Sequence, residues 1–560
     1  MEVQNLFEPN EEITLESYLN KMGIDNINKY LKPPTSVLDK CWIYDNIKEG
    51  IQILKYHILN DDRIAIIQDA DNDGICSSYM MYKTLRQHGV SKVKPFIQNG
   101  KERGIESKSM RDRLLKWQPN LVIIPDAGTN SIQWESEFID NGIDLLIIDH
   151  HASDDSVCKR AIVINNTMNQ LECNRSLSGT GVTFKVIQAL DYEMDTKYSN
   201  KFIDLVGLSI ISDSMDVTTY ENRWFLKYIL DDKDHINNQF IYELFDNLLG
   251  DTYTQRDISF RIVPLFNSVI RCGTLEDKQN LFMAFCGKNI EDTIKMCQNY
   301  HTQQVNTVNS FVERHIDEIE AQSESNITII DATDVPQAFS GLIAGKISGM
   351  TNKPCIIGKS VKGELGGSFR GYIPRSIMET LPHVNRAAGH PTGAYGIFID
   401  TSKSQNLDEF RAEIDKMDIS TIPTVIASFS ANKLQMGIFN EFVGHDDLWG
   451  KELDKPTFCI YNIKVKSKNI KVMGDKFNTL KICMDGYELM FFKVSREQLK
   501  QFGITIHKDN PIPVHYDDLE LNISIVGSVN INEYYNRRTN QIIVDDYEIK
   551  VIENSFEDLM

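Results

Sequence analysis

Short apolar runs alternate with helical periodicity between residues 61 and 231. Four runs rich in Ile, Leu and Val have the length of buried strands, and they span 63–68, 121–124, 145–148 and 161–164. Residues 75–88 and 107–117 carry the apolar spacing of amphipathic helices. Apolar strands that alternate with helices are typical of a parallel sheet covered by helices on both faces. The pattern therefore predicts an α/β domain over residues 61–231.

The rest of the chain shows other patterns. Residues 232–325 predict a helical connector, and residues 326–415 predict a second, smaller α/β domain. Between 456 and 552 apolar and polar residues alternate over short strands, which suits a small β-barrel such as an OB-fold. The remaining segments are an N-terminal extension (1–60), an unassigned linker or insertion (416–455) and an acidic tail (553–560).

Composition narrows the functional classes. The 560 residues are 41% hydrophobic and 25% charged, which indicates several packed domains. The net charge of −20 argues against a general coat for duplex DNA, but it leaves room for a nucleic-acid enzyme with a local basic path. The ten cysteines form no closely spaced pair, which argues against a structural zinc site or a disulfide scaffold. Without a signal pattern or an apolar stretch of about 18–20 residues, we expect a cytoplasmic protein with no membrane segment.

Acidic residues and histidines follow three of the predicted strands. Ligands of parallel sheets bind beyond the carboxyl ends of the strands, so these side chains can converge on one crevice. Hard divalent cations prefer carboxylate oxygens, and imidazole completes the set for Mn²⁺. Two such ions about 3.5–4 Å apart promote phosphoryl transfer, so the cluster predicts a di-metal phosphoesterase. Its members are Asp69, Asp71, Asp73, Asp126, Asp149, His150 and His151.

Other interpretations of these residues stay open at this point. The segment Asp69–Gly74 matches the opening of an EF-hand loop, but Met80 stands at the twelfth position, where that loop needs Glu. An Asp-Asn-Asp-Gly segment is also typical of a solvated turn. A further ligand, Asp213, competes with Asp216, and either residue can serve as a helix cap instead.

Together these motifs resemble the DHH phosphoesterase superfamily, and within it the RecJ-type exonucleases specific for single-stranded DNA. The segment Asp69–Gly74 and the triplet Asp149-His150-His151 resemble the first and third family motifs. Further similar segments of the first domain are 124–128, 178–182 and 211–213. The second α/β domain resembles the associated DHHA1 domain at 339–346, 367–370 and 388–395. The barrel resembles the RecJ OB-fold at 526–533 and 541–545.

The resemblance implies a 5′→3′ exonuclease that uses two Mn²⁺ or Mg²⁺ ions and releases 5′-mononucleotides from single-stranded DNA in recombination, repair or replication. The metal ligands that it implies are Asp69, Asp71, Asp73, Asp126, His150 and Asp213. The catalytic residues that it implies are His151, which would stabilise the phosphate or protonate the leaving oxygen, Asp149, which would orient a histidine, and His390. The substrate-binding residues that it implies are Ser368, Arg370, and Lys101 or Arg103 in place of a family arginine.

The predicted barrel carries a basic strip that is a candidate path for a single strand. OB-folds bind single strands by combining a basic groove with stacking aromatic rings. The lysines of the strip are Lys464, Lys466, Lys468 and Lys471, and the candidate stacking residues are Tyr461, Phe477, Tyr534 and Tyr535. The alternative is an edge strand whose lysines prevent association, with aromatic residues in the core.

Two other functions compete with the exonuclease. A DHH phosphodiesterase for short oligonucleotides or cyclic dinucleotides would use the same metal cluster, but such relatives generally lack an OB-fold. A non-catalytic single-strand-binding scaffold would have no reason to keep a costly carboxylate cluster. We expect single-stranded DNA as the partner and a monomeric protein, and the family suggests a single-strand-binding protein or a helicase as further partners.

Overall fold

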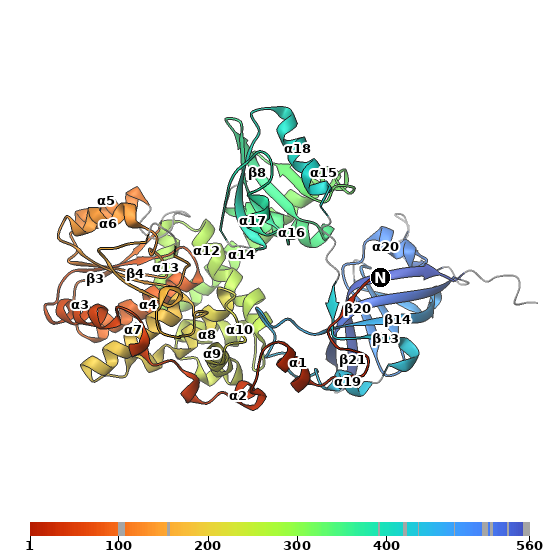
Figure 1. Cartoon of the computed structure of the whole chain (residues 1–560), viewed down its shortest axis with the longest axis horizontal. Helices are drawn as coiled ribbons and strands as arrows, with labels where there is room; N and C mark the ends of the chain where they lie inside the picture. The colour runs from red at the N-terminus through yellow and green to blue at the C-terminus, as the bar shows by residue number, and fades with distance from the viewer. Residues whose placement is uncertain are drawn as a thin grey trace, which may run out of the picture. The chain divides into compact units, whose positions relative to one another are not determined.

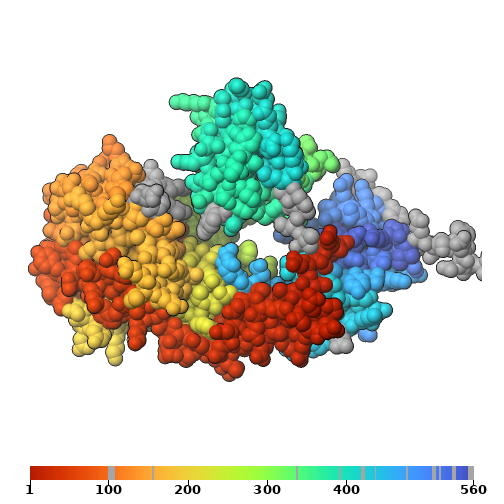
Figure 2. All heavy atoms as spheres, viewed as in Figure 1, coloured from red at the N-terminus to blue at the C-terminus, as the bar shows by residue number. Residues whose placement is uncertain are grey.

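The computed structural model describes most of the chain, and the described residues are drawn in colour in Figures 1 and 2. They are 1–98, 107–153, 157–335, 337–389, 392–417, 423–434, 436–474, 477–506, 513–515, 519–534 and 537–552. The chain divides into two compact units. The first consists of Met1–Leu38, Ser214–Leu230 and Thr421–Met560, and the second of Asp39–Asp213 and Asp231–Ser420.

A five-stranded parallel sheet forms the first part of the second unit, as the pattern predicts. Its strand order is β3-β2-β4-β5-β6. The strands are β2 (Ile64–Gln68), β3 (Val93–Ile97), β4 (Leu121–Pro125), β5 (Asp144–Asp149) and β6 (Ile162–Asn165). Four of the five were predicted. Strand β3 was not predicted, because Lys94 and Pro95 interrupt its apolar run. An edge strand such as β3 tolerates both residues.

Helices cover both faces of this sheet (Figure 1). One face packs on α5 (Lys108–Trp117) and α6 (Ile132–Ile139), and the contacts include Ile67 and Ile147 of the strands. The other face packs on α3 (Ile47–Leu59), α4 (Asn72–Gln87) and α7 (Gly179–Met194). Helix α3, which lies within the N-terminal extension predicted from the pattern, approaches the sheet so closely that a Cβ at Gly50 would lie 2.8 Å from Ile164 Cδ1.

Helices follow the sheet, as the pattern predicts for the connector. They begin with α8 (Ile203–Ser212) and α9 (Tyr220–Asp231), of which α9 belongs to the first unit. The connector itself contains α10 (Gln239–Leu248), α11 (Gln255–Asp257), the π-helical turn η6 (Ile258–Ile262), α12 (Val263–Cys272), α13 (Leu275–Phe285), α14 (Ile290–Arg314) and α15 (Ile316–Glu320). Apolar residues of α14, including Phe311, pack on the second α/β domain.

The second α/β domain is a five-stranded mixed sheet with helices on both faces. Its order is β10-β11-β9-β8-β7, and only β7 and β8 run parallel. The strands are β7 (Thr328–Asp331), β8 (Cys355–Val361), β9 (Glu364–Arg370), β10 (Val384–Gly389) and β11 (Ala394–Asp400). One face packs on α16 (Gln337–Thr351) and the other on α18 (Ser404–Asp415).

The first unit contains the predicted C-terminal β-domain. Its seven strands have the order β13-β14-β20-β21-β17-β16-β15. They are β13 (Ser428–Ser430), β14 (Thr457–Lys466), β15 (Ile470–Met473), β16 (Thr479–Cys483), β17 (Glu488–Phe491), β20 (Glu520–Tyr534) and β21 (Arg537–Val551). A turn over Ser467–Asn469 separates β14 from β15, and there the backbone N–H of Ser467 donates to the Leu519 carbonyl while its hydroxyl donates to the Gly503 carbonyl. Among the described residues, no helix is both long and apolar enough to cross a membrane.

Candidate metal centre

The first acidic motif joins strand β2 to helix α4. Asp71 is the N-cap of the helix, and its Oδ1 accepts a hydrogen bond of 2.9 Å from the Gly74 amide. A Cβ at Gly74 would lie 2.7 Å from the carbonyl oxygen of Asp69, so only glycine fits at this position. The carboxylates of Asp69 and Asp73 are 1% and 2% exposed. A strand precedes the motif and the acids are buried, which excludes both the EF-hand loop and the solvated turn.

Asp126 follows strand β4 in a left-handed conformation, with φ of 69°. Its amide donates to the Ile148 carbonyl at 2.7 Å, which fixes the turn beside strand β5. The side chain is 1% exposed. Within the described part of the chain, neither of its carboxylate oxygens accepts a hydrogen bond. The ring of His150 is the ion-pair neighbour of Oδ1, and buried polar atoms are nearly always hydrogen-bonded, so this carboxylate marks a place where a cation fits.

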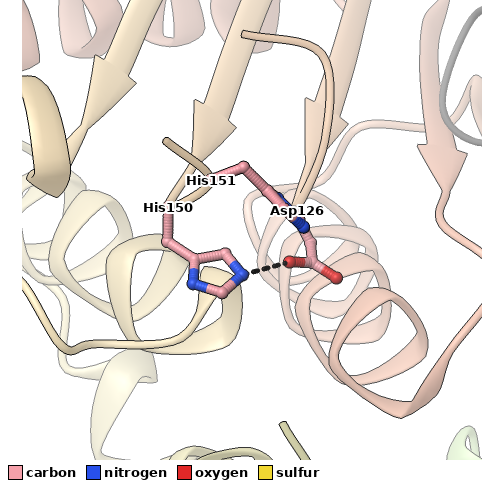
Figure 3. Close-up of side chains that lie close together, drawn as sticks. All are labelled: Asp126, His150 and His151. Atoms are coloured by element: carbon pink, nitrogen blue, oxygen red, sulfur yellow. Dashed lines mark ion pairs between the residues drawn. The ribbon is translucent and has the colours of Figure 1, made fainter. Parts of the chain in front are cut away.

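His150 points from the end of β5 into the acidic cluster, and Figure 3 shows its ring facing Asp126. Its Nε2 lies 3.2 Å from Asp126 Oδ1, 3.5 Å from Asp213 Oδ2 and 3.7 Å from Asp73 Oδ2. Burial lowers the pKa of His150, and the charge of Asp73 opposes this shift. Asp213 therefore lies in the cluster, whereas the carboxylate of Asp216 accepts hydrogen bonds from Thr218.

The N-terminus of α7 binds the carboxylate of Asp73, which lies in the first turn of α4. The amides of Gly179 and Thr180 donate to its two oxygens at 2.7 and 2.8 Å, and the hydroxyl of Ser209 donates to Oδ1. Burial raises the pKa of Asp73, but the charge of His150 and these hydrogen bonds outweigh burial and lower it below the ordinary value. The glycine-rich segment after β6 thus keeps Asp73 ionised.

Asp149 accepts hydrogen bonds from several donors and orients His151. Its Oδ1 accepts from His151 Nδ1 at 2.8 Å and from the His150 amide at 2.7 Å, while Oδ2 accepts from the Thr129 amide at 3.0 Å. Burial opposes ionisation, but the hydrogen bond and the charge of His151 hold the pKa of Asp149 well below its usual range. The carboxylate therefore fixes the tautomer and orientation of His151, with Nε2 as the remaining ring nitrogen.

The electrostatics of the cluster fit divalent cations. Burial and the charges of Asp73 and Asp71 raise the pKa of Asp126 well above its ordinary value. Such repulsion between buried carboxylates costs stability unless a cation offsets it. Three sets of side chains have ligand atoms that lie within 4.8 Å of one another. They are Asp126, His150 and His151; Asp73, His150 and Asp213; and Asp69, Asp71 and Asp126.

A cavity of about 380 Å³ adjoins the cluster, and its wall includes Asp71 and two residues that the sequence analysis missed. Asn267 and Arg271 lie one turn apart on α12 and both line the cavity. Burial lowers the pKa of Arg271, and the charge of Asp71 opposes this shift. The signal in the sequence was a pair of polar residues at i and i+4 within a helix that is otherwise apolar except for Ser268.

The second α/β domain supplies the opposite wall of this cavity, including Ser368 and Arg370. The hydroxyls of Ser368 and Ser340 lie 2.8 Å apart, and Arg370 Nη1 donates to the Phe369 carbonyl at 2.7 Å. A Cβ at Gly341 would lie 2.6 Å from Arg370 Nη2, so the glycine makes room for the guanidinium. Burial and the charge of Arg271 lower the pKa of Arg370. Two arginines that line one cavity with Asp71 and Asp73 have the chemistry to hold a phosphate group.

The other predicted site residues lie outside the described part of the chain or belong to the first unit. His390, Lys101 and Arg103 lie outside the described residues, as does the predicted stacking residue Tyr535. The lysines of the C-terminal β-domain belong to the first unit: Lys466 forms an ion pair with Glu520, and Lys468 lines a separate cavity of about 600 Å³. The other basic residues of that cavity are Lys471, Lys481 and His515. Strand β14 pairs with β13 only through residues 459–461, whereas its pairing with β20 continues to Lys466. Lys464 and Lys466 therefore lie in a part of β14 that does not pair with β13. The interpretation of an edge strand whose lysines prevent association stays open.

Comparisons with known proteins identify two domains. The model of the DHH family, N-terminal domain, matches residues 63–210, and the model of the RecJ OB domain matches residues 429–546. The second match includes part of the segment that the sequence pattern left unassigned. A Bacillus subtilis (strain 168) protein named "Putative SPbeta prophage-derived single-strand DNA-specific exonuclease YorK" is 25% identical over 590 aligned positions, which cover 98% of this chain and 97% of the relative.

Two further comparisons concern RecJ proteins. The single-stranded-DNA-specific exonuclease RecJ of Bacillus subtilis (strain 168) is 23% identical over 387 positions, which cover 67% of this chain and 48% of the relative. The crystal structure of RecJ in complex with Mn²⁺ from Thermus thermophilus matches with a TM-score of 0.72 and 16% identity, over 95% of this chain and 75% of that one. The chain therefore shares the fold of RecJ.

Proposed function

We propose that this chain, which carries a DHH family N-terminal domain and a RecJ OB domain, is a divalent-metal 5′→3′ exonuclease that hydrolyses single-stranded DNA to 5′-mononucleotides. The observation that carries the proposal is the buried cluster at the ends of β2, β4 and β5, beside a cavity lined by two arginines. The relatives named as single-strand DNA-specific exonucleases support the same activity.

The residues present fit two Mn²⁺ or Mg²⁺ ions. The candidate ligands are Asp69, Asp71, Asp73, Asp126, His150 and Asp213. Carboxylate oxygens suit both metals, and the imidazole of His150 suits Mn²⁺ in particular. Asp126, whose oxygens accept no hydrogen bond from the described residues, is the strongest sign of such a site. When bound, the ions would polarise the scissile phosphate and lower the pKa of the attacking water.

The chain's own residues position the strand and move the proton. Arg271, Arg370 and Ser368 would hold the phosphate at the 5′ end and so place the first internucleotide phosphate over the metal cluster. In the hydrolysis, water adds to phosphorus, the bond to the 3′ oxygen breaks, and that oxygen takes a proton. His151, oriented by Asp149, would donate this proton from Nε2 when its ring carries a proton on both nitrogens. His390, beyond the described residues, remains a candidate for the same cleft.

The C-terminal β-domain supports a polymeric substrate over a dinucleotide. Its basic surface includes Lys464, Lys466 and Lys468, which would contact the backbone of the strand downstream of the reacting end. A helicase or a single-strand-binding protein would supply such strands in replication, recombination or repair, with the enzyme acting as a monomer. A cytoplasmic location is consistent with the described cysteines, none of which forms a disulfide.

The test is a time course on single-stranded DNA labelled at the 3′ end, with Mn²⁺, with Mg²⁺ and with EDTA. The Asp126→Asn protein should be inactive, and a matched Asp140→Asn protein, changed at an exposed carboxylate, should retain activity. Metal-dependent shortening from the 5′ end would support the proposal. Activity only on dinucleotides or cyclic dinucleotides would replace it with the small-substrate phosphodiesterase, and strand binding without any hydrolysis would indicate a scaffold.

A further inference from the structure

Asn165 is the last residue of strand β6, and its side chain is buried beside the end of β5. The two strands run parallel, and their register pairs Asn165 with Asp149. The side chain is 4% exposed, so its donors and its acceptor need partners within the protein. The partners that it finds lie at the same edge of the sheet as the metal cluster.

The amide of Asn165 uses both of its donors and its acceptor. Its Nδ2 donates to the carbonyl oxygen of His151 and to Thr129 Oγ1, both at 2.9 Å. Its Oδ1 accepts from the Thr167 amide at 2.8 Å. A backbone carbonyl only accepts and a backbone N–H only donates, so these partners fix the orientation of the amide. Aspartate at this position would lack the two donors, and an apolar side chain would lack all three groups.

These contacts close a ring of hydrogen bonds around the Asp-His-His motif. The Thr129 amide donates to Asp149 Oδ2 at 3.0 Å, and Asp149 Oδ1 accepts from His151 Nδ1 at 2.8 Å. The hydrogen bond from Asn165 to the His151 carbonyl completes the ring. Asp149 thus fixes the imidazole while Asn165 fixes the backbone of the same residue. With both ends fixed, the side chain of His151 keeps one rotamer although it is 40% exposed.

We propose that Asn165 is a positioning residue, which holds His151 where its Nε2 can protonate the departing 3′ oxygen. The inference rests on the proposed exonuclease activity. In that reaction water adds to phosphorus and loses a proton to solvent, the bond from phosphorus to the 3′ oxygen breaks, and this oxygen takes a proton from Nε2. Asn165 is not among the described residues that line the cavity, so it acts through His151. A displacement of about 1 Å in such a group is enough to slow the transfer strongly.

Two variants break the ring at different points. Asn165→Asp keeps the acceptor for the Thr167 amide and loses both donors, so the turn after β6 keeps its cap. Thr129→Val keeps the amide that binds Asp149 and loses only the hydroxyl, without a change of charge. Asn169→Ala is the matched control, because this asparagine is also buried but its Nδ2 donates to carbonyls outside the ring.

The substrates are two single strands of one sequence that differ in one atom of the first linkage. One carries the ordinary 3′ oxygen, and the other carries sulfur in its place. A thiol ionises far more readily than an alcohol, so the sulfur departs without taking a proton. The kcat and KM for removal of the first nucleotide are measured with saturating Mn²⁺, and the affinity for Mn²⁺ by calorimetry. His151→Ala, alone and combined with Asn165→Asp, tests whether the amide acts through the histidine.

On the oxygen strand, kcat should fall by about 10–100-fold in Asn165→Asp and by less in Thr129→Val. The KM, the Mn²⁺ affinity and the rate on the sulfur strand should change little. In the His151→Ala background, Asn165→Asp should have no further effect. Asn169→Ala should leave the ratio of the two rates at the wild-type value.

Equal losses on the two strands, a loss of Mn²⁺ affinity, or independent effects of Asn165→Asp and His151→Ala would overturn the inference. If the wild type shortens no strand, the proposed function fails by itself. The effects of the same two changes on the free energy of unfolding then decide the inference. Additive effects would show that the amide does not hold His151, and non-additive effects would show that it does.

Discussion

Gly179 lies directly against the carboxylate of Asp126, and a Cβ at this position would collide with Oδ1. The amide of the same glycine donates to Asp73 Oδ2 at 2.7 Å. One residue at the start of α7 therefore contacts two candidate metal ligands that come from different strand ends. This close approach explains why the segment after β6 needs glycine.

Replacing Gly179 by Ala should damage the metal site more than the fold. The methyl group would push Asp126 aside, so we expect the affinity for Mn²⁺ and the exonuclease rate to fall by about 10–100-fold, as for other groups that hold metal ligands in place. Calorimetric titration of Mn²⁺ measures the first effect. The matched control is Gly349→Ala on α16, where a Cβ would meet nothing within 4 Å. Equal Mn²⁺ affinity in the two variants would contradict the prediction.

Asp126→Asn should make the metal-free protein more stable while it abolishes activity. Asparagine tolerates the left-handed conformation, and it removes a buried charge. Because the pKa of Asp126 is raised in the folded state, its contribution to stability is present at low pH and is lost as the pH rises through the raised value. We expect a gain of about 1–3 kcal/mol in the free energy of unfolding at pH 8 with EDTA. Denaturant unfolding measures this, and an equal or lower stability than wild type would refute the prediction.

Asp204 should make stability depend on pH independently of the metal cluster. Its Oδ2 accepts hydrogen bonds of 2.9 Å from the amides of Asn237 and Asn238, but burial outweighs them and raises its pKa to about 6. The protonated form favours the folded state, so the contribution of Asp204 to stability is fully present below about pH 4, falls between about pH 4 and 6, and is lost above pH 6. The raised pKa corresponds to a loss of up to about 3 kcal/mol. In Asp204→Asn, thermal unfolding with saturating Mn²⁺ should lose this part of the pH dependence, and an unchanged profile would exclude the assignment.

Arg370→Ala should make the enzyme indifferent to a 5′ phosphate. A hydrogen bond to a charged group contributes about 1.5–3 kcal/mol, so KM for the 5′-phosphorylated strand should rise by about 10–100-fold. KM for the 5′-hydroxyl strand should change little. Arg386→Ala is the matched control in the same domain, because this arginine is exposed and packs on Phe398. A parallel rise in KM on both strands would instead place Arg370 away from the terminal phosphate.

The sequence predicted the metal cluster because every part of its signal is local. A buried strand is evident from an apolar run, and the residue type at its end shows whether a carboxylate or an imidazole follows. The predicted runs became β2, β4, β5 and β6, and Asp69, Asp126 and His150 follow the ends of the first three. Parallel pairing then brings these ends to one edge of the sheet.

The sequence did not reveal the parts of the cavity that come from distant segments. Arg271 lies on a helix that the pattern treats only as connector, and nothing local indicates that it reaches Asp71. The sequence also left open whether Asp213 or Asp216 belongs to the cluster. The structure favours Asp213, because α8 ends at this residue and its carboxylate lies near His150, which follows β5.

By itself, the sequence thus predicted which strands end in carboxylates or histidines and the order of the α/β and β-rich segments along the chain. Only the tertiary structure decided that the Asp126 carboxylate receives no hydrogen bond from the described residues, that Gly179 leaves room for it and that two arginines face the cluster. The physical reason is that periodicity reports the burial of each segment along the chain. The contacts between segments depend instead on how their side chains pack together, which no single segment encodes.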